Sequence, residues 1–395
     1  MLCRVLTCVL ATALVTACAK DSSAPTQRST RTDSAGVAIL RGPAEDVPLP
    51  WAFTELRRIG GADSGVFAFA RVSHSNVASD GASTIGVLDS DADNRVRLFT
   101  GDGAYLRTVG RKGGGPGETQ YPNGLRLDTS GVVSVYDFMK NAIVSWGPDG
   151  TPRPEHRALS PRGSVFEDAV LIADTVFVAV QSNDSLSSLR RLERWTLFDT
   201  MVITSILSAK PKMTRFKCIG IALPPLFSGE LTWTRSSTGV VASTTQTQYE
   251  VAVYRGTSLV KSVRRAIAPA IAKPSDAVKL YPEDFKVMFG GGAPPCVTPA
   301  TEVGEKVGVA KFIPLIRKMR FAPDGSLWVE RYTFKGETPA VDVFDADGQY
   351  LGTASGRSLP LGFLGNDRVL FAIENADDGT SVIGVFQIVR ATAAR

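Results

Sequence analysis

The sequence predicts an all-β protein that folds as a six-bladed β-propeller, and three observations support this prediction. The first is a set of glycine-ending turn pairs between short, alternating apolar segments: Asp102-Gly103, Asp149-Gly150 and Asp347-Gly348. Asp-Gly favours a hairpin turn because glycine adopts a positive φ without a Cβ clash. The second is spacing, since an earlier turn precedes each pair by 19 to 23 residues, at Asp80-Gly81, Ser130-Gly131 and Asp324-Gly325.

The third observation is that the unit recurs six times. Each copy has an apolar strand, a polar loop, a second alternating strand and a tight turn, and the copies span Val87–Gly110, Val135–Arg153, Asp174–Thr200, Gly239–Gly256, Val329–Gly352 and Asn366–Val389. A unit of about four short strands cannot bury both of its faces, so the units are expected to stack in a ring. The predicted propeller spans residues 36–392.

Residues 1–17 have the pattern of a secretory signal peptide. Arg4 precedes an apolar run from Val5 to Val15, which is shorter than the roughly 20 residues that a membrane span requires. The sequence Val-Thr-Ala-Cys that ends at Cys18 resembles the bacterial lipobox. This resemblance implies cleavage between Ala17 and Cys18 and lipidation of Cys18, with palmitate among the acyl chains.

Residues 18–35 are rich in Ser, Thr, Ala and Asp, and we expect them to form a flexible tether after the lipidated Cys18. Several acyl chains on Cys18 would anchor the protein to the membrane, because stable anchoring takes about two lipid signals. The bacterial sorting rule that accompanies the lipobox favours the outer membrane when Ala19 follows the cysteine. We therefore expect a lipid-anchored envelope protein that faces the periplasm, although the sequence leaves surface exposure open.

Two segments of the propeller have no place in the repeated unit. The segment Gly36–Leu40 is apolar, and we expect it to supply the outer strand of the last blade, which would close the ring and cover an exposed edge. The segment Lys273–Gly292 has helix-like spacing. It predicts a short helical insertion in the fifth blade, with Pro282 at the helix start and glycines at its end.

Cys218 and Cys296 are the two cysteines that remain once the signal peptide and Cys18 are set aside. An exported chain meets an oxidising compartment, so these two residues are candidates for a disulfide bond. Two separate buried thiols are the alternative.

The Asp-Gly turns, the Tyr136-Asp137…Asn141 pattern and the element Gly110–Glu118 resemble the six-bladed propeller lipoproteins of bacteria, which are related to NHL-repeat proteins. The resemblance covers residues 36–392, and it departs from the family at Thr119, where an aromatic residue is usual. It implies a fold much more firmly than a function, because one propeller scaffold serves many functions.

The glycine-rich stretch GRKGGGPGE, residues 110–118, invites comparison with a phosphate-binding loop. A phosphate loop places its lysine after the glycines and opens a helix, whereas here Lys112 precedes them and a strand-like segment follows. Pro116 also removes a backbone donor. We therefore expect a structural turn between blades one and two. An anion-binding nest of backbone amides beside Arg111 and Lys112 is the alternative.

The enzyme alternative is a calcium-dependent lactonase-type hydrolase, because gluconolactonase-type enzymes resemble this chain in having six blades and hold Ca²⁺ in the channel. By that resemblance Asn123 would be a surviving ligand, but Arg317 occupies the position of the ligand Asp. The segment from Ser64 to Ser79 contains no carboxylate for the third ligand. A fixed positive charge opposes a bound cation, so we expect no catalytic residue, no metal ligand and no cofactor.

The remaining prediction is a binding or scaffolding module. Lys plus Arg number 44 against 39 for Asp plus Glu, which gives a net charge of +5. This excess of positive charge is too small and too scattered to indicate a nucleic-acid surface. Arg71 and Arg317 lie near predicted inner-strand starts, where they would make the channel mouth cationic. Salt-bridged arginines within the blades are the alternative. We expect a monomer whose partner is an envelope protein, an acidic peptide or a carboxylate-bearing glycan.

We expect the side chains of three tryptophans, Trp146, Trp195 and Trp328, to pack between blades.

Overall fold

The computed structural model describes most of the body of the chain. The described residues are 29–60, 69, 72–89, 93–157, 165–172, 175–183, 188–195, 200–288, 294–374 and 381–390. Cys18, Ala17 and Arg71 lie outside this set, as does most of the expected tether. Within it, no helix is long and apolar enough to cross a membrane.

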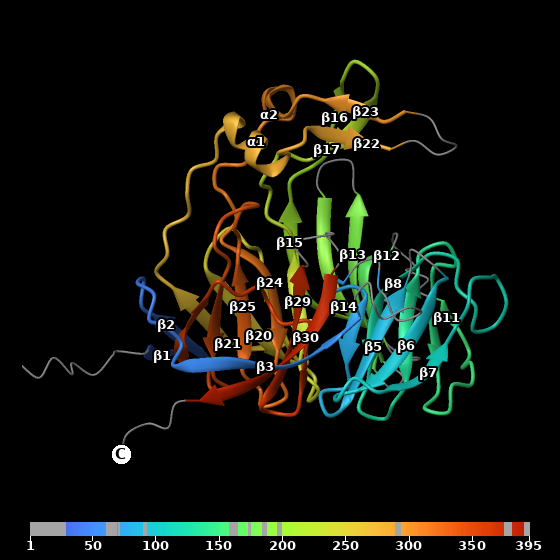
Figure 1. Ribbon diagram of the computed structural model, residues 1–395. Coiled ribbons are helices and arrows are strands. Elements are labelled where there is room, and N and C mark those ends of the chain that lie inside the picture. Colours follow the sequence, from blue (N-terminus) through green and yellow to red (C-terminus); the bar gives the residue numbers. More distant parts are fainter. Residues whose placement is uncertain are drawn as a thin grey trace, which may run out of the picture.

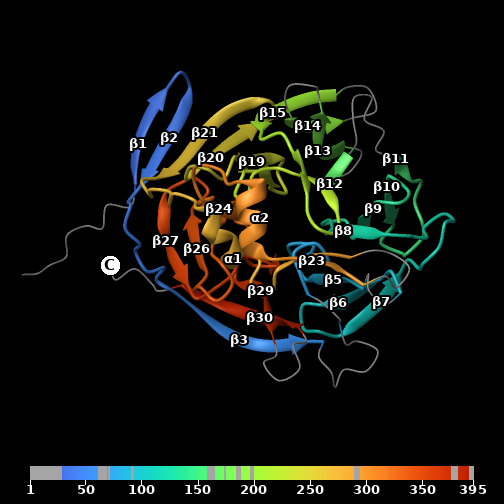
Figure 2. The same cartoon turned by 90° about the horizontal axis from the view of Figure 1, so that it is seen from above.

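Among the described residues, five four-stranded sheets and one six-stranded sheet are arranged as six blades around a central channel (Figures 1 and 2), which confirms the predicted β-propeller fold. Blade one contains β4 (Val77–Ser79), β5 (Thr84–Asp89), β6 (Arg95–Thr100) and β7 (Tyr105–Val109). Blade two contains β8 (Pro122–Leu127), β9 (Val133–Asp137), β10 (Ala142–Trp146) and β11 (His156–Arg157). Blade three contains β12 (Val165–Ile172), β13 (Thr175–Asn183), β14 (Ser188–Trp195) and β15 (Thr200–Ser208).

The other three blades follow in chain order. Blade four contains β18 (Thr232–Arg235), β19 (Val240–Thr244), β20 (Glu250–Arg255) and β21 (Ser258–Arg265). Blade five contains β24 (Ile316–Phe321), β25 (Leu327–Arg331), β26 (Ala340–Phe344) and β27 (Tyr350–Ser355). Blade six contains β28 (Gly362–Leu364), β29 (Arg368–Glu374), β30 (Ser381–Arg390) and β3 (Trp51–Ile59).

Side chains on both faces of the middle strands pack between blades and form the core. All five residues of β9 and all five of β10 are buried, because neighbouring blades cover both faces of each sheet. Trp146 and Trp328 are each 1% exposed, so these two tryptophans pack in the core as predicted. Gly103, Gly150 and Gly348 all have φ between 79° and 89°, as the predicted turns require.

The N-terminal strands differ from the prediction. An N-terminal strand does complete the last blade, but it is β3, which pairs antiparallel with β30. The predicted segment lies instead in β2 (Val37–Gly42), which pairs parallel with β21 and extends blade four. The buried Leu40 fits this position beside the Gly348 turn. β1 (Thr30–Ser34) pairs with β2 and overlaps the end of the expected tether.

Two insertions form a cap over one end of the ring (Figure 1). The first, between blades three and four, contains β16 (Lys212–Arg215) and β17 (Gly220–Leu223). The second, between blades four and five, contains the 3₁₀ turn η2 (Pro274–Asp276), α1 (Ala277–Leu280), β22 (Phe285–Val287), β23 (Cys296–Thr298) and α2 (Ala300–Val307). The two share an apolar cluster that includes Phe216, Ala277 and Val303. A disulfide bond between Cys218 and Cys296, with Cα atoms 5.7 Å apart, joins them covalently.

The helical insertion begins earlier than predicted. Pro274, rather than Pro282, lies in the first turn, and the α1 helix ends at Leu280 before Pro282 is reached. Lys273 is extended and its backbone N–H donates to the Asp276 carboxylate, which caps the start. The insertion also lies between blades four and five rather than within blade five, and Phe285–Val287 of the predicted segment forms β22 rather than helix.

Candidate functional site

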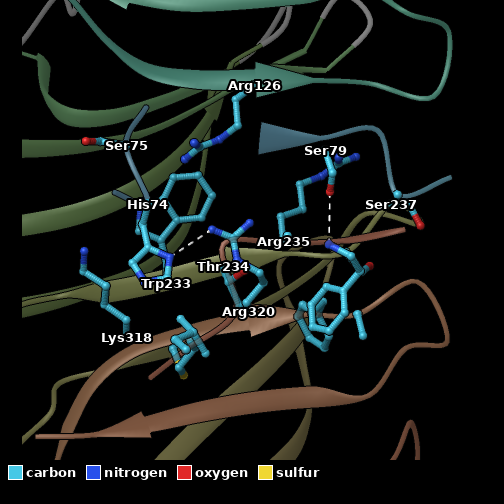
Figure 3. A pocket seen from close by; sticks show the side chains of 18 of the residues that line it. His74, Ser75, Ser79, Arg126, Trp233, Thr234, Arg235, Ser237, Lys318 and Arg320 are labelled. Carbon is cyan, nitrogen blue, oxygen red and sulfur yellow. Dashed lines mark hydrogen bonds between the residues drawn. The ribbon is translucent and has the colours of Figure 1, made fainter. Parts of the chain in front are cut away.

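The central channel contains a cavity of about 760 Å³. Its walls are the inner strands of the blades together with the loops at their ends, and Figure 3 shows a part of this lining. The volume lies within the range of about 300–1,000 Å³ that is usual for small-molecule sites. The cavity is therefore the natural place for a ligand in this fold.

Positively charged side chains dominate the ionisable part of the lining. Six of the described lining residues are basic, namely Arg126, Arg190, Arg235, Arg317, Lys318 and Arg320. They come from blade two, blade three, blade four and blade five. Three of the six lie on β24 and the others on three further blades, so the positive charge reaches the cavity from several sides.

The three carboxylates of the described lining are engaged locally. Asp80 Oδ1 accepts hydrogen bonds from the backbone N–H groups of residues 82, 83 and 84 at 2.8 to 2.9 Å. Asp128 Oδ1 accepts in the same way from the amides of Ser130 and Val132, at 2.9 Å each. Glu230 lies 3.6 Å from Arg190. Two carboxylates thus shape turns and the third faces one cation, which leaves the channel with an excess of positive charge.

His74 lies within this positive environment. Its Nδ1 is 3.5 Å from an Arg320 guanidinium nitrogen (Figure 3). Burial lowers the pKa of His74 well below 6.5, and the charges of Arg320, Lys318, Arg317 and Arg126 lower it further. The imidazole is therefore neutral at physiological pH and adds no charge of its own to the channel.

The depressed pKa of His74 predicts a pH-dependent stability. Below about pH 6.5 an unfolded histidine binds a proton that folded His74 does not, so the free energy of unfolding should fall as pH falls. The His74→Gln variant should lose less stability than the wild type between pH 7.0 and 5.5, as measured by urea denaturation. The His156→Gln control should keep the wild-type pH dependence. Equal losses in the wild type and in His74→Gln would contradict the assignment.

Arg317, predicted from the sequence to face the channel, does line the cavity. It is the second residue of β24, its side chain is exposed, and its carbonyl accepts a hydrogen bond from Gln246 Nε2 at 3.2 Å. Among the described residues no carboxylate forms a salt bridge with its guanidinium. Its role as an anion contact stays a prediction, and its predicted companion Arg71 lies outside the described residues.

Asn123 lines the cavity, but its surroundings do not fit a calcium ion. Its Oδ1 accepts a hydrogen bond from the Gly124 N–H at 2.9 Å, as a turn residue does. Ca²⁺ takes six to eight oxygen ligands, and within the described part of the chain no three His, Cys, Asp or Glu residues lie together in a metal-binding arrangement. The cavity that Asn123 lines has six basic side chains against three carboxylates, and this excess of positive charge opposes a bound cation.

The glycine-rich loop of residues 110–118 holds a carboxylate of its own. Glu118 Oε2 accepts from the Gly115 N–H at 2.8 Å, and Glu118 Oε1 accepts from Arg111 Nε at 2.7 Å. The same contacts lower the pKa of Glu118. Lys140 donates to the carbonyls of Gly115 and Glu118, and Gly117 closely approaches Trp146. The loop is thus a structural turn in which Glu118 occupies the place that an external anion would take.

The sequence pattern does not predict several of the residues that line the channel. Trp233 and Arg235 lie on β18, the inner strand of blade four, but the repeat of that blade was recognised only from Gly239 onward. The alternation Thr-Trp-Thr-Arg of residues 232–235 is the signal that could have revealed them. Arg126 and Arg320 lie on strands that were predicted, but the side of the strand that faces the channel depends on register.

The family comparison agrees with the fold. Residues 73–157, which include blades one and two, match the DUF5128 family, described as a 6-bladed beta-propeller. No curated protein matches the chain.

Solved structures resemble the chain over most of its length. A member of the DUF4221 family from Bacteroides vulgatus is 10% identical, with a TM-score of 0.51, and the match covers 87% of this chain and 100% of that one. A Bacteroides fragilis protein described as exported is 12% identical, with a TM-score of 0.49 and coverage of 90% and 100%. Regucalcin from Agrobacterium tumefaciens, a calcium-binding protein, is 9% identical, with a TM-score of 0.37 and coverage of 87% and 96%. At 10% identity the DUF4221 likeness supports the propeller fold and no function.

Proposed function

We propose that this chain is an envelope lipoprotein whose propeller binds an anionic ligand in its central channel without transforming it. The observation that supports the proposal is the lining of the cavity, where six basic residues face three locally engaged carboxylates. A cleft with walls of one sign of charge concentrates ligands of the opposite sign. Arginine also binds carboxylates through two parallel hydrogen bonds, which gives orientation as well as attraction.

The lactonase-type alternative has less support. It requires a calcium ion that polarises a carbonyl, and hard oxygen ligands to hold that ion. Arg317 and Lys318 line the same cavity as Asn123, and Asn123 Oδ1 already accepts the Gly124 N–H within β8. These observations favour a channel that receives an anion over one that holds a cation.

Neutralising Arg317 and Lys318 tests the binding role. Both side chains are exposed, so Arg317→Gln/Lys318→Gln should fold normally. A hydrogen bond to a charged group contributes about 1.5–3 kcal/mol, so losing one such contact should weaken carboxylate binding about tenfold to a hundredfold. The measurement is isothermal titration of the full chain in detergent with trigalacturonate and with triglutamate, at low and high salt.

The matched control is Arg57→Gln/Lys112→Gln, which removes the same net charge from exposed positions outside the channel. It should bind as the wild type does. If neither probe binds at low salt, or if both double variants weaken binding equally, the channel is not the site. Hydrolysis of a lactone substrate that EDTA abolishes would support the lactonase-type enzyme instead.

The envelope location is part of the proposal and rests on the signal and lipobox patterns around Cys18. The Cys18→Ala variant should be released from the membrane fraction, because the acyl chains supply the anchor. Fractionation followed by immunoblotting measures this. Retention of Cys18→Ala in the membrane, with no other lipid on the chain, would contradict the anchor.

A further inference from the structure

We propose that the anion is an acidic sugar chain, bound with a sugar ring against Trp233 and with its carboxylates on the surrounding cations. The inference rests on the proposed function of the channel and deepens it. The positive charge alone would suit two kinds of anion, a uronic-acid oligosaccharide and an acidic peptide, and we infer that the ligand is the oligosaccharide. Two features of the lining favour the sugar, and a third favours a ligand with several carboxylates.

The first feature is the position of Trp233. This residue lies at the centre of β18, packs against the apolar cluster of Leu192, Ile203 and Val241, and lines the cavity. Figure 3 shows the indole in the part of the channel that also contains His74 and Arg126. The packing supports the ring from outside the channel, so that a rigid amphipathic surface borders the cavity. The apolar face of a pyranose ring fits such a surface.

The second feature is the density of small hydroxyl groups in the lining. Serines and threonines contribute from blades one, two and four, among them Ser75, Ser79, Ser134, Thr232, Thr234 and Ser237. Three of these hydroxyls already make one bond within the protein, Ser75 with Ser73, Ser79 with the Phe363 N–H and Thr232 with Gln246. A hydroxyl both donates and accepts hydrogen bonds, and it rotates to suit its partner. Sugar hydroxyls have the same property, whereas the carboxylates of an acidic peptide only accept. The lining therefore suits a ligand that is itself covered with hydroxyls.

The third feature is the spread of the cations. Arg126 comes from blade two, Arg235 from blade four, and Lys318 with Arg320 from blade five. One carboxylate cannot reach cations on several sides of a cavity of about 760 Å³. A chain with a carboxylate on each unit presents one at regular intervals, so neighbouring units can contact different blades; an acidic peptide shares this property, and the choice of a sugar rests on Trp233 and the hydroxyl groups.

The test compares three probes of similar length on the full chain in detergent, by isothermal titration. Trigalacturonate is the acidic sugar, a neutral galactose trisaccharide lacks the charge, and triglutamate lacks the rings. The wild type should bind trigalacturonate at least tenfold more tightly than either of the others. The Trp233→Leu variant should weaken trigalacturonate about fivefold or more and leave triglutamate unchanged, because leucine removes the flat apolar face against which the sugar ring packs. Trp233→Phe should restore most of the affinity.

The outcomes separate this inference from the proposed function. If triglutamate binds through Arg317 and Lys318 while trigalacturonate does not, the sugar is wrong and the anion-binding channel stands. If trigalacturonate binds equally to the wild type and to Trp233→Leu, with thermal melting showing both folded, the role of Trp233 is overturned. If no probe binds, both proposals fail. Should Trp233→Leu not fold, Trp233→Met, which keeps more of the bulk but no flat ring, replaces it in the same comparison.

Discussion

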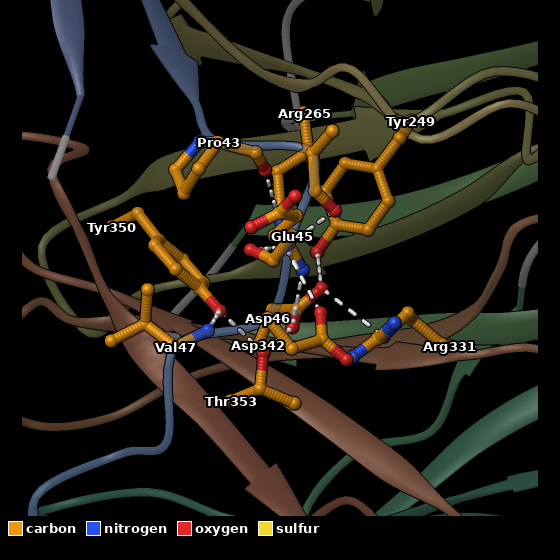
Figure 4. A network of polar contacts seen from close by, with 11 residues as sticks. Pro43, Glu45, Asp46, Val47, Tyr249, Arg265, Arg331, Asp342, Tyr350 and Thr353 are labelled. Atoms are coloured by element: carbon orange, nitrogen blue, oxygen red, sulfur yellow. Dashed lines mark hydrogen bonds and ion pairs between the residues drawn. The ribbon is translucent and has the colours of Figure 1, made fainter. Parts of the chain in front are cut away.

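Replacing Asp342 with asparagine should lower the free energy of unfolding by about 3–5 kcal/mol, the cost of breaking a buried ion pair by removing one partner. Asp342 and Arg265 are both fully buried, and the guanidinium donates to Asp342 Oδ1 at 2.9 Å. Figure 4 shows how the remaining acceptor positions of the carboxylate are filled. Tyr249 donates to Oδ2 and Thr353 to Oδ1, at 2.5 Å each.

The same network fixes the segment that connects β2 to β3. Arg265 also donates to the carbonyls of Pro43 at 2.9 Å and of Glu45 at 2.8 Å, and to the Asp46 carboxylate at 3.0 Å. Arg331 reaches Asp46 from blade five at 2.6 Å. Losing Asp342 should therefore loosen the N-terminal segment as well as the junction between blades four and five.

Urea denaturation measures the effect, and a double variant supplies the control. Replacing a buried ion pair entirely with apolar residues is often neutral or stabilising. Arg265→Met/Asp342→Leu leaves no uncompensated buried charge, but it also removes the bonds of Arg265 to Pro43, Glu45 and Asp46, so it should not recover the wild-type stability. Glu55→Gln, which breaks the exposed pair between Glu55 and Arg58, should change stability little. An Asp342→Asn variant as stable as the wild type would show that the network has no stabilising role.

Removing the disulfide bond should lower stability by about 4 kcal/mol, because Cys218 and Cys296 are separated by 78 residues and the bond restricts the unfolded chain over that length. For a chain of this size that corresponds to a drop of roughly 5 °C in the melting midpoint. The enclosed loop contains the whole of blade four, so the effect should extend beyond the cap.

Thermal melting of Cys218→Ser/Cys296→Ser measures this effect, with and without a reductant. The wild type should melt lower when reductant is added, whereas the double variant should melt at the lower midpoint under both conditions. A double variant with the wild-type midpoint would mean that the apolar contacts among Phe216, Ala277 and Val303 hold the cap without the bond.

The sequence predicted the parts of the fold that depend on local chemistry. The turn at Gly103 requires a positive φ, and the Asp-Gly pair indicates it without reference to the rest of the chain. Local chemistry of this kind does not indicate whether β2 or β3 is the strand that pairs with β30 and closes the ring. Both segments are rich in apolar residues, and which one reaches β30 depends on the path of the chain between Gly42 and Trp51.

Only a few of the side chains that line the channel could be predicted from the sequence. Arg317 could be placed because it lies near the start of a recognisable strand, whereas Trp233 lies in β18, which precedes the part of the blade-four repeat that the pattern predicts. In addition, a one-residue change in register moves a side chain to the other face of its strand. The side chains that line the cavity therefore depend on pairings across the whole ring, and these pairings are not visible in a local pattern.

The most direct test of the account is a crystal structure of the protein with trigalacturonate. The account predicts electron density for the sugar inside the channel, with carboxylate oxygens within hydrogen-bond distance of Arg317 or Lys318 and a ring against Trp233. An empty channel with the sugar bound on an outer face, or a metal ion held at Asn123, would contradict it.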